Sequence, residues 1–322
     1  MKIGLITDSL SMMSFDQALD VAAGLGLASV EVATGNWSQA RHVDLAALVE
    51  SADARANFQD KVTSRGLEIS ALCANGNQLH PVSGGQQARV VRDTIEVAGA
   101  LGSPTVVLMS GLPGGSASDR VPNWVTTAWP PENLAVLDYQ WDEVALPYWT
   151  DLTTHARNAG VRLAVEACGG QLVHNVSSMQ RLIRETDAEV VGANLDPSHL
   201  MWMGADIPDV IHALATSIFH VHAKDVRINR WRAGKDGILD TVVHTSPEAR
   251  AWNYVTLGLG HPDGAAFWAE FVYELRAVGY DGTLNIEHED SLVNSVEGVS
   301  KAADLLNHVI LRDAPDWVPA NI

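Results

Sequence analysis

The sequence predicts a single (β/α)8 TIM barrel, and three observations predict it. Short apolar runs alternate with segments of helical periodicity along the chain, which is typical of a parallel sheet covered by helices. Four of the later runs end in a carboxylate or an imidazole: Glu166, Asp196, His222 and Glu287. The intervals from Glu166 to Asp196 and from Asp196 to His222 are 30 and 26 positions, the length of one strand-and-helix unit.

The first third of the chain predicts an uninterrupted alternation of strands and helices. Phe15, Ala18, Leu19 and Ala22 follow helical spacing, and Ser14 before them is a natural N-cap. The same reasoning places strands at residues 2–7, 28–32, 67–73 and 105–109, with helices at 15–25, 45–64 and 86–101.

The rest of the chain predicts four more strand-and-helix units with two long interruptions. A loop without clear periodicity spans 111–140, and a second insertion spans 226–263 after the seventh strand. Long loops in compact domains are commonly lids, binding elements or subunit contacts. Helices are expected at 141–159, 177–185, 206–215, 265–278 and 294–311, within one catalytic domain of residues 1–312 and a tail of residues 313–322.

Composition restricts the class of partner and the compartment. The chain has 322 residues with 21 basic and 39 acidic side chains, a formal charge of −18. This charge repels phosphate backbones and anionic lipid surfaces, so neither nucleic acid nor a membrane is an expected partner. The two cysteines, Cys73 and Cys168, do not make a disulfide framework. No apolar run approaches ~20 residues, and we expect a soluble, cytoplasmic protein.

The residues at the four strand ends predict a metal centre. A charged group at the end of a buried strand is costly unless a cation offsets its burial. A single acid at a strand end is usually a helix cap or an ion-pair partner, so the pattern of four carries the prediction. Three carboxylates and one imidazole suit Mn²⁺, Mg²⁺, Co²⁺ or Zn²⁺, with Mn²⁺ the first choice. The predicted ligands are Glu166, Asp196, His222 and Glu287.

Several motifs resemble a known family. They are the run 194–200 (Asn-Leu-Asp-Pro-Ser-His-Leu), the run 222–225 (His-Ala-Lys-Asp), the run 285–290 (Asn-Ile-Glu-His-Glu-Asp), and the segments 75–77 and 80–81. Over nearly the whole chain they are similar to the sugar isomerases and epimerases of the xylose isomerase-like TIM barrels, a group related to the catalytic subunits of C-glycoside deglycosidases. The resemblance implies one divalent metal on the four ligands named above. It also implies that two ligand carboxylates move protons and that His199 binds a substrate oxygen.

The chain departs from the family pattern at two places. Many members carry a histidine two residues after the strand-five glutamate, where this chain has Cys168. The epimerases place an arginine six residues after the strand-seven histidine, where this chain has Ile228. Other arginines follow nearby, but none stands at the matching position.

The chemistry of such a centre predicts a reaction class. A metal chelated by a carbonyl and a neighbouring hydroxyl acidifies the intervening C–H and stabilises an enediolate. We expect a metal-dependent sugar or cyclitol isomerase or epimerase in which Glu166 and Glu287 move the proton. One alternative is a lyase that cleaves 3-oxo-glycosides by β-elimination together with a small β-rich subunit. Cleavage of abasic DNA is disfavoured by the acidic charge.

Residues around the predicted centre supply substrate contacts in this interpretation. The predicted substrate-binding residues are His199, Lys224, Asp225, Cys168, Trp37 and Asn75. Lys224 and Asp225 could instead form an ordinary strand-end ion pair, and Cys168 could be a small buried thiol. The loop tryptophans, Trp37, Trp124, Trp129, Trp231 and Trp252, suit either a sugar face or a subunit contact in a homo-oligomer. His220 and His288 are expected on the opposite face of their strands, in structural roles.

Overall fold

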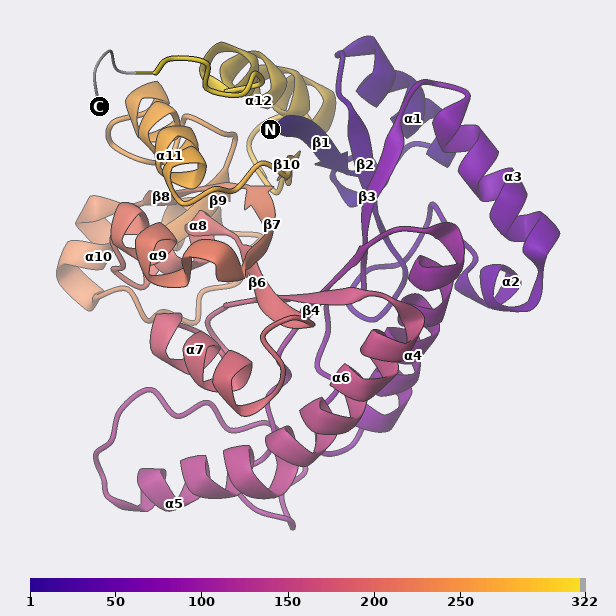
Figure 1. Ribbon diagram of the computed structural model, residues 1–322. Coiled ribbons are helices and arrows are strands. Elements are labelled where there is room, and N and C mark those ends of the chain that lie inside the picture. The colour runs from indigo at the N-terminus through magenta and orange to yellow at the C-terminus, as the bar shows by residue number, and fades with distance from the viewer. Residues whose placement is uncertain (319–322) are drawn as a thin grey trace.

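The computed structural model describes residues 1–318, and they form a closed barrel of eight parallel strands, which confirms the predicted fold class (Figure 1). The pairing order around the barrel is β1, β10, β7, β6, β5, β4, β3, β2 and back to β1. The strands are β1 (Lys2–Ile6), β2 (Ser29–Ala33), β3 (Glu68–Cys73), β4 (Thr105–Met109), β5 (Arg162–Glu166), β6 (Val191–Leu195), β7 (Ile218–Ala223) and β10 (Thr283–Ile286).

Helices surround the barrel and cover its strands from outside (Figure 1). The longer ones are α1 (Phe15–Gly24), α3 (Ala52–Thr63), α4 (Gly84–Leu101), α6 (Leu146–Ala159), α7 (Val176–Glu185), α9 (Ile207–Leu214), α11 (Ala265–Ala277) and α12 (Ser295–Val309). Ser14 caps α1 as expected, because its side chain accepts a hydrogen bond from the Gln17 N–H. Two short helices, α2 (Leu45–Glu50) and α8 (Pro197–Trp202), lie in connections between strands and longer helices.

The apolar core has two parts because the strands alternate inward and outward side chains. A large cluster fills the space between strands and helices and includes the fully buried Trp149, Trp268 and Phe271. A small inner cluster lies within the barrel and is made of Ile6, Ala33, Ala71, Cys73, Val107 and Ala164. These inner side chains are mostly small, and polar side chains on the same inward-facing positions occupy the rest of the interior.

Three expected segments differ from the sequence prediction. The helix expected at 45–64 is two helices, because Ser51 takes an extended backbone and caps α3 through a hydrogen bond from the Ala54 N–H. The loop expected at 111–140 contains the helix α5 (Glu132–Asp138), followed by the π-helical turn η2 (Tyr139–Ala145). None of the residues of α5 is buried, and its four apolar residues, 134–137, are consecutive within a single seven-residue helix, so no helical period is visible in the sequence.

The insertion 226–263 is also structured. It forms an antiparallel hairpin of β8 (Asp225–Ile228) and β9 (Trp252–Val255), with α10 (Arg230–Asp236) and the short 3-10 turn η4 (Pro247–Ala249) between them. The strands of this hairpin mix polar with apolar residues and are only partly buried, so neither is a short apolar run of the kind that marks the barrel strands.

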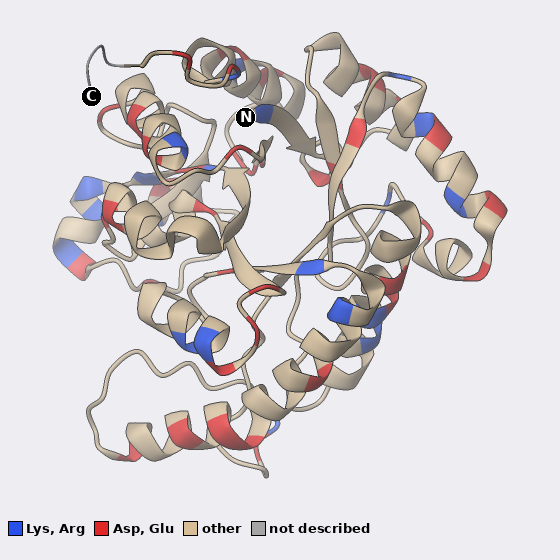
Figure 2. Cartoon of the chain, in the orientation of Figure 1, with Lys and Arg blue, Asp and Glu red and all other residues tan. Residues whose placement is uncertain are grey.

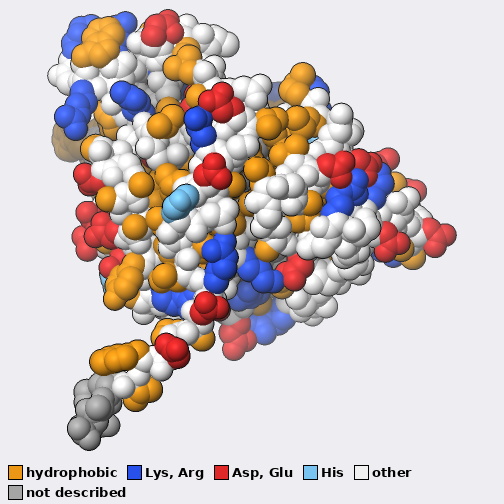
Figure 3. Space-filling model, turned by 90° about the horizontal axis from the view of Figure 1, so that it is seen from above, with side chains coloured by type: hydrophobic (Ala, Val, Ile, Leu, Met, Phe, Trp, Pro, Cys, Tyr) orange, Lys and Arg blue, Asp and Glu red, His pale blue; other side chains and the backbone are white. Residues whose placement is uncertain are grey.

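Beyond α12 the described chain has no regular secondary structure, and it projects from the barrel in Figure 3. The predicted tail, 313–322, lies partly outside the described residues. Within residues 1–318, no helix is both long and apolar enough to cross a bilayer.

Candidate metal centre

The four predicted ligands meet at one end of the barrel. Glu166 is the last residue of β5, His222 is the next-to-last of β7, and Asp196 and Glu287 directly follow β6 and β10. One ligand atom from each lies within 4.8 Å of the others, and all but the partly exposed Glu287 are buried. The arrangement follows from topology, because parallel strands of a closed barrel all end on the same face.

The atoms of this cluster fit a divalent cation. Among the described residues, Asp196 Oδ2, His222 Nδ1 and Glu287 Oε2 are buried atoms without a hydrogen-bond partner. His222 Nδ1 lies 3.0 Å from Glu166 Oε2 and 2.9 Å from Glu287 Oε2. Buried polar atoms are normally paired, so the convergence of these ligand-type atoms on one point fits a shared cation. Three carboxylates and an imidazole nitrogen are ligands for a divalent metal of the Mn²⁺, Mg²⁺, Co²⁺ or Zn²⁺ type.

Glu31 holds the ligand histidine in place from within the barrel. Both Glu31 carboxylate oxygens lie 3.1 Å from His222 Nε2. The carboxylate accepts the Nε2 proton, which leaves the lone pair of Nδ1 directed at the other three ligands. Glu31 Oε2 also lies 2.7 Å from His220 Nε2 and accepts from Asn285 Nδ2 at 3.0 Å. Burial raises the pKa of Glu31, but His222 and His220 outweigh it and lower the pKa to about 2.

The expected orientation of His220 was wrong. His220 and His222 are two positions apart on β7, so alternation directs both side chains to the same, inward side. Their ring centroids are 5.7 Å apart. His288 lies elsewhere, against α12, where a Cβ on Gly298 would come within 2.0 Å of its ring.

Glu166 is bound on both oxygens by neighbouring side chains. Its Oε2 accepts from Asn194 Nδ2 at 2.7 Å, and its Oε1 lies 2.9 Å from His199 Nε2. His199 is placed by α8, whose N-cap is Asp196. The Asp196 Oδ1 accepts from the Ser198 N–H and hydroxyl, which leaves Oδ2 for the centre. One carboxylate therefore both begins the helix that carries His199 and points toward the predicted metal.

Lys224 places a buried ammonium group beside the centre. Its Nζ lies 3.2 Å from Glu287 Oε1, 2.7 Å from Glu289 Oε2 and 4.2 Å from the centroid of the Tyr254 ring. Burial lowers the pKa of Lys224, but Glu287 and Glu289 outweigh it and hold the pKa above its usual value. On the carboxyl group of Asp196 burial has the opposite effect, and it raises the pKa of that group to about 6. Contact of Lys224 with a substrate stays a prediction.

Asp225 anchors the β8–β9 hairpin. Its carboxylate accepts hydrogen bonds from four backbone N–H groups and, at 3.4 Å, from the Trp268 indole. The backbone donors are Val226 at 2.8 Å, Gly258 at 2.9 Å, His261 at 3.0 Å and Gly260 at 3.1 Å. Because five protein groups donate to it, the Asp225 carboxylate stabilises the conformation of this loop region. Its predicted contact with substrate remains a prediction.

The other predicted substrate contacts lie on loops at the same face of the barrel. Cys168 Sγ is 3.4 Å from His199 Nδ1 and also donates to the Gly169 carbonyl at 3.4 Å. Trp37 follows β2 and Asn75 follows β3, and the Trp37 N–H donates to the Asn75 carbonyl at 3.0 Å. The Trp37 side chain is exposed, and Asn75 Oδ1 is buried without a partner among the described residues. Their predicted roles in substrate binding remain predictions.

The hairpin brings aromatic side chains to the centre. Trp252 lies on β9 and stacks on Trp202 with ring centroids 4.6 Å apart. Tyr254 lies two residues further, and its hydroxyl is 2.7 Å from His199 Nδ1. Two of the tryptophans that were expected in loops lie in regular secondary structure: Trp252 is in β9, and Trp231 is in α10.

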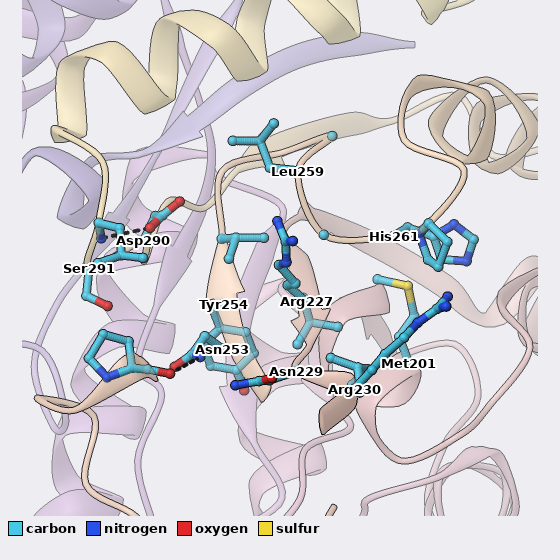
Figure 4. A pocket seen from close by; sticks show the side chains of 18 of the residues that line it. Met201, Arg227, Asn229, Arg230, Asn253, Tyr254, Leu259, His261, Asp290 and Ser291 are labelled. Carbon is cyan, nitrogen blue, oxygen red and sulfur yellow. Dashed lines mark hydrogen bonds between the residues drawn. The ribbon is translucent and has the colours of Figure 1, made fainter. Parts of the chain in front are cut away.

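A half-open groove of about 1240 Å³ lies next to the hairpin (Figure 4). Its walls come from β8, β9, the loop 258–264 and the loop 290–293, with Arg227, Arg230, Asn253 and Asp290 among its polar side chains. Tyr254 lines this groove and also reaches His199. None of the four predicted metal ligands is among the residues that line it.

Sequence reasoning missed two residues of this site. Glu31 gave a signal that was overlooked, since it is a charged residue inside the apolar run of β2, as the predicted ligands are at their strand ends. Tyr254 gave none, because its position depends on the path of a hairpin that the sequence does not predict.

The barrel, with its cluster of carboxylates and an imidazole at the strand ends, defines the chain as an α/β barrel with its candidate site at one end. A family model described as xylose isomerase-like TIM barrel matches residues 19–309. The chain belongs to this family, as the sequence motifs predicted.

Individual relatives support the same assignment. The protein YfiH of Bacillus subtilis (strain 168) is 41% identical over 314 residues, which cover 96% of this chain and 99% of YfiH. Inosose dehydratase of Geobacillus thermodenitrificans (strain NG80-2) is 29% identical over 152 residues, 46% of this chain and 47% of that protein. Among solved structures, a D-tagatose 3-epimerase-like protein superposes with a TM-score of 0.64 at 19% identity, covering 96% of this chain and 98% of its own.

Proposed function

We propose that the protein is a divalent-metal-dependent isomerase or epimerase of sugars or cyclitols, which removes a proton from the carbon next to a carbonyl. The observation that carries the proposal is the convergence of Glu166, Asp196, His222 and Glu287 at the barrel end, with unpaired buried atoms directed at one point. Mn²⁺ is the proposed metal, with Mg²⁺, Co²⁺ and Zn²⁺ as alternatives of similar ligand preference. The metal supplies Lewis-acid polarisation of a substrate carbonyl.

The side chains around the centre have separable tasks. Glu166 and Glu287 approach it from β5 and β10, which β6 and β7 separate in the barrel, so they can reach opposite faces of a bound ring. One carboxylate takes the proton and the other returns one to the opposite face, which inverts the carbon. Lys224 is the proposed donor to a substrate oxygen, because its ammonium group lies beside Glu287, and His199, beside Glu166, is the proposed second contact with a substrate oxygen.

Elimination is the second candidate reaction, favoured by the similarity to inosose dehydratase over nearly half of the chain. The first step is the same proton abstraction next to a carbonyl. The enediolate then expels a group from the β-carbon, as water or as an alcohol, instead of taking a proton back. A lyase acting on 3-oxo-glycosides, working with a small β-rich subunit, is the form of this proposal in which the leaving group is an aglycone.

The experiment that separates these reactions is incubation of the Mn²⁺-loaded protein in D₂O with ketoses, inosose-type cyclitols and 3-oxo-glycosides, followed by NMR after the metal is removed. Deuterium at one carbon of an epimerised or isomerised product supports the first proposal. Loss of the β-substituent, seen as an unsaturated ketone or its tautomer or as a released aglycone, supports elimination. If no substrate of these three classes exchanges or reacts, the proposal is contradicted.

Partners follow from the same interpretation. We propose a small carbohydrate as the substrate and a homo-oligomer as the assembly, with neither nucleic acid nor membrane as a partner. The charge of −18 supports the exclusion of nucleic acid, since phosphate backbones are repelled. In Figure 2 the basic positions on α10 stand among acidic positions spread over the surrounding helices, and they do not extend into a long stripe.

A further inference from the structure

We propose that Tyr254 is a positioning residue for His199, holding its imidazole so that Nε2 stays on Glu166. This inference rests on the proposed function only in that His199 is taken to serve the same centre. The β8–β9 hairpin is not part of the eight-stranded barrel, and the proposal gives this added hairpin a function.

The hydrogen bonds around His199 lead to this assignment. His199 Nε2 lies 2.9 Å from Glu166 Oε1 and 3.2 Å from Asp196 Oδ2. An ionised carboxylate can only accept, so Nε2 carries the proton in the neutral ring. Nδ1 is then an acceptor, and the Tyr254 hydroxyl, 2.7 Å away, is its donor. Without this donor the ring could exchange tautomers or rotate, and Glu166 would lose a hydrogen bond.

A tyrosine hydroxyl suits this task because it both donates and accepts. If His199 takes up a proton, the hydroxyl can rotate and accept from Nδ1–H, so the ring keeps its orientation in both protonation states. Cys168 Sγ is also near Nδ1, at 3.4 Å, but a thiol is a weak donor and this one has the Gly169 carbonyl as another acceptor. The shorter contact to the better donor decides in favour of Tyr254.

The surroundings of Tyr254 fix the hydroxyl in space. Its ring packs edge-on against His199 with centroids 5.3 Å apart and against Trp252 at 5.2 Å. Lys224 Nζ lies over the same ring. The hairpin that carries it is held by the Asp225 carboxylate, so the position of one hydroxyl is set by a chain of buried contacts. Tyr254→Phe keeps the ring and all these packing contacts and removes the hydroxyl alone.

The test is ¹⁵N NMR of the full-length, histidine-labelled protein loaded with diamagnetic Mg²⁺, and of the same protein without metal. The chain has 12 histidines, and the His199 signals are identified by their loss in His199→Gln. We expect the wild-type His199 to be protonated at Nε2 and unprotonated at Nδ1. Tyr254→Phe should give mixed or exchange-broadened tautomers. An unchanged His199 pattern in Tyr254→Phe, or a wild-type ring protonated at Nδ1 alone, would overturn the proposal.

Two control variants distinguish a specific effect of the Tyr254 hydroxyl on the His199 ring from a general effect of substitution on the protein. Tyr280→Phe removes a hydroxyl that donates to the Thr283 carbonyl at 2.7 Å at the start of β10, away from the centre, and should leave the His199 pattern intact. Cys168→Ala should also leave it intact. If Cys168→Ala alone gave mixed tautomers, the thiol would hold the ring and the proposal would fail. Circular dichroism verifies that each variant is folded.

Kinetics give a second readout once a substrate is found. Loss of one hydrogen bond to a positioned group should lower kcat by about 3- to 10-fold in Tyr254→Phe with little change in KM. An increase in KM with unchanged kcat would instead make Tyr254 a substrate-binding group and overturn the positioning role. If no substrate turns over in the wild-type protein, the proposed function fails, while the NMR experiment still decides the role of Tyr254.

Discussion

Glu166 and Glu287 differ in how the protein holds them. Hydrogen bonds from Asn194 and His199 occupy both oxygens of Glu166, whereas Glu287 Oε2 is unpaired among the described residues and its side chain is partly exposed. Glu166 is therefore fixed before a substrate arrives, and Glu287 has an oxygen free for new contacts. In the proposed function, each of these carboxylates acts both as a metal ligand and as a base.

Replacing either glutamate by glutamine should remove the base while keeping the shape. We expect kcat to fall by about 10²- to 10⁴-fold in Glu166→Gln and in Glu287→Gln, more than substrate affinity falls. Steady-state kinetics with metal content measured in parallel check this. Glu189→Gln, an exposed acid that pairs with Arg157, is the control. Near-normal turnover in either variant would leave that residue as a ligand or structural acid only.

Glu31 is expected to control metal affinity from behind the ligand histidine. Glu31→Gln weakens the carboxylate contact that fixes the His222 tautomer, so we expect metal affinity to fall by about 10- to 100-fold. Titration calorimetry with Mn²⁺ measures it, and Glu68→Gln, which alters an exposed pair with Lys2, is the matched control. Equal affinity in wild type and Glu31→Gln would show that the histidine needs no such support.

Cys168 and His199 should differ sharply in importance. His199 touches two ligand carboxylates, while the Cys168 thiol has hydrogen-bond contacts within residues 1–318 only to the His199 ring and the Gly169 carbonyl. Cys168→Ser should keep most of the activity and His199→Ala should lose most of it, with metal content unchanged in both. The reverse order would mean that Cys168 performs the task of the histidine that many family members carry at its position.

Among the secondary-structure elements, the β8–β9 hairpin carries Tyr254 to the candidate metal centre at the end of the barrel. The Asp225 carboxylate binds backbone donors on both sides of the hairpin, and Asp290 accepts from the Thr256 N–H and hydroxyl at 2.8 and 2.9 Å. These contacts tie the hairpin to the loops after β9 and β10. The Tyr254 side chain of β9 is thereby held against His199 and Lys224.

Breaking this anchor should loosen the hairpin before the barrel. We expect Asp225→Ala to lower the free energy of unfolding by about 2–4 kcal/mol, because it leaves several buried N–H groups unpaired. Limited proteolysis should cut first within 226–263, as mass spectrometry can show. Asp263→Asn, at an exposed acid of the same region, should do neither. Resistance of 226–263 to proteolysis in Asp225→Ala would contradict the anchoring role.

Whether the sequence predicts a helix or strand depends on the length of that element and on how much of it is buried. The eight strands and the longer helices have strong apolar patterns, so the barrel and the ends of its strands could be predicted, and with them the meeting of Glu166, Asp196, His222 and Glu287. Helix α5 and the strands β8 and β9 could not, because α5 has no buried face and the hairpin strands, which are only partly buried, mix polar with apolar residues. Tyr254 was missed for the same reason, since its place beside His199 follows from that hairpin.

At the scale of the whole molecule, the acidic charge and the metal are connected. The centre gathers three carboxylates in a chain of net charge −18, and Lys224 alone supplies a nearby ammonium group among the described residues. A divalent cation bound only by the folded state should therefore stabilise it. At a free Mn²⁺ concentration 100 times the dissociation constant, the expected gain is about 2.7 kcal/mol in the free energy of unfolding.

Denaturant titrations with Mn²⁺ and with EDTA measure that gain. Asp196→Asn should show a smaller difference between the two conditions, because the variant removes one ligand charge. Equal stability of the wild-type protein in Mn²⁺ and EDTA would contradict specific binding to the folded state.

The central claim is that one divalent cation lies among the four strand-end ligands. Anomalous diffraction from crystals grown with Mn²⁺ tests it most directly. We expect one strong anomalous peak with oxygen or nitrogen atoms of Glu166, Asp196, His222 and Glu287 at about 2–2.6 Å. A peak between Glu31 and His220 instead, or two of the four side chains more than ~4 Å from the ion, would contradict it.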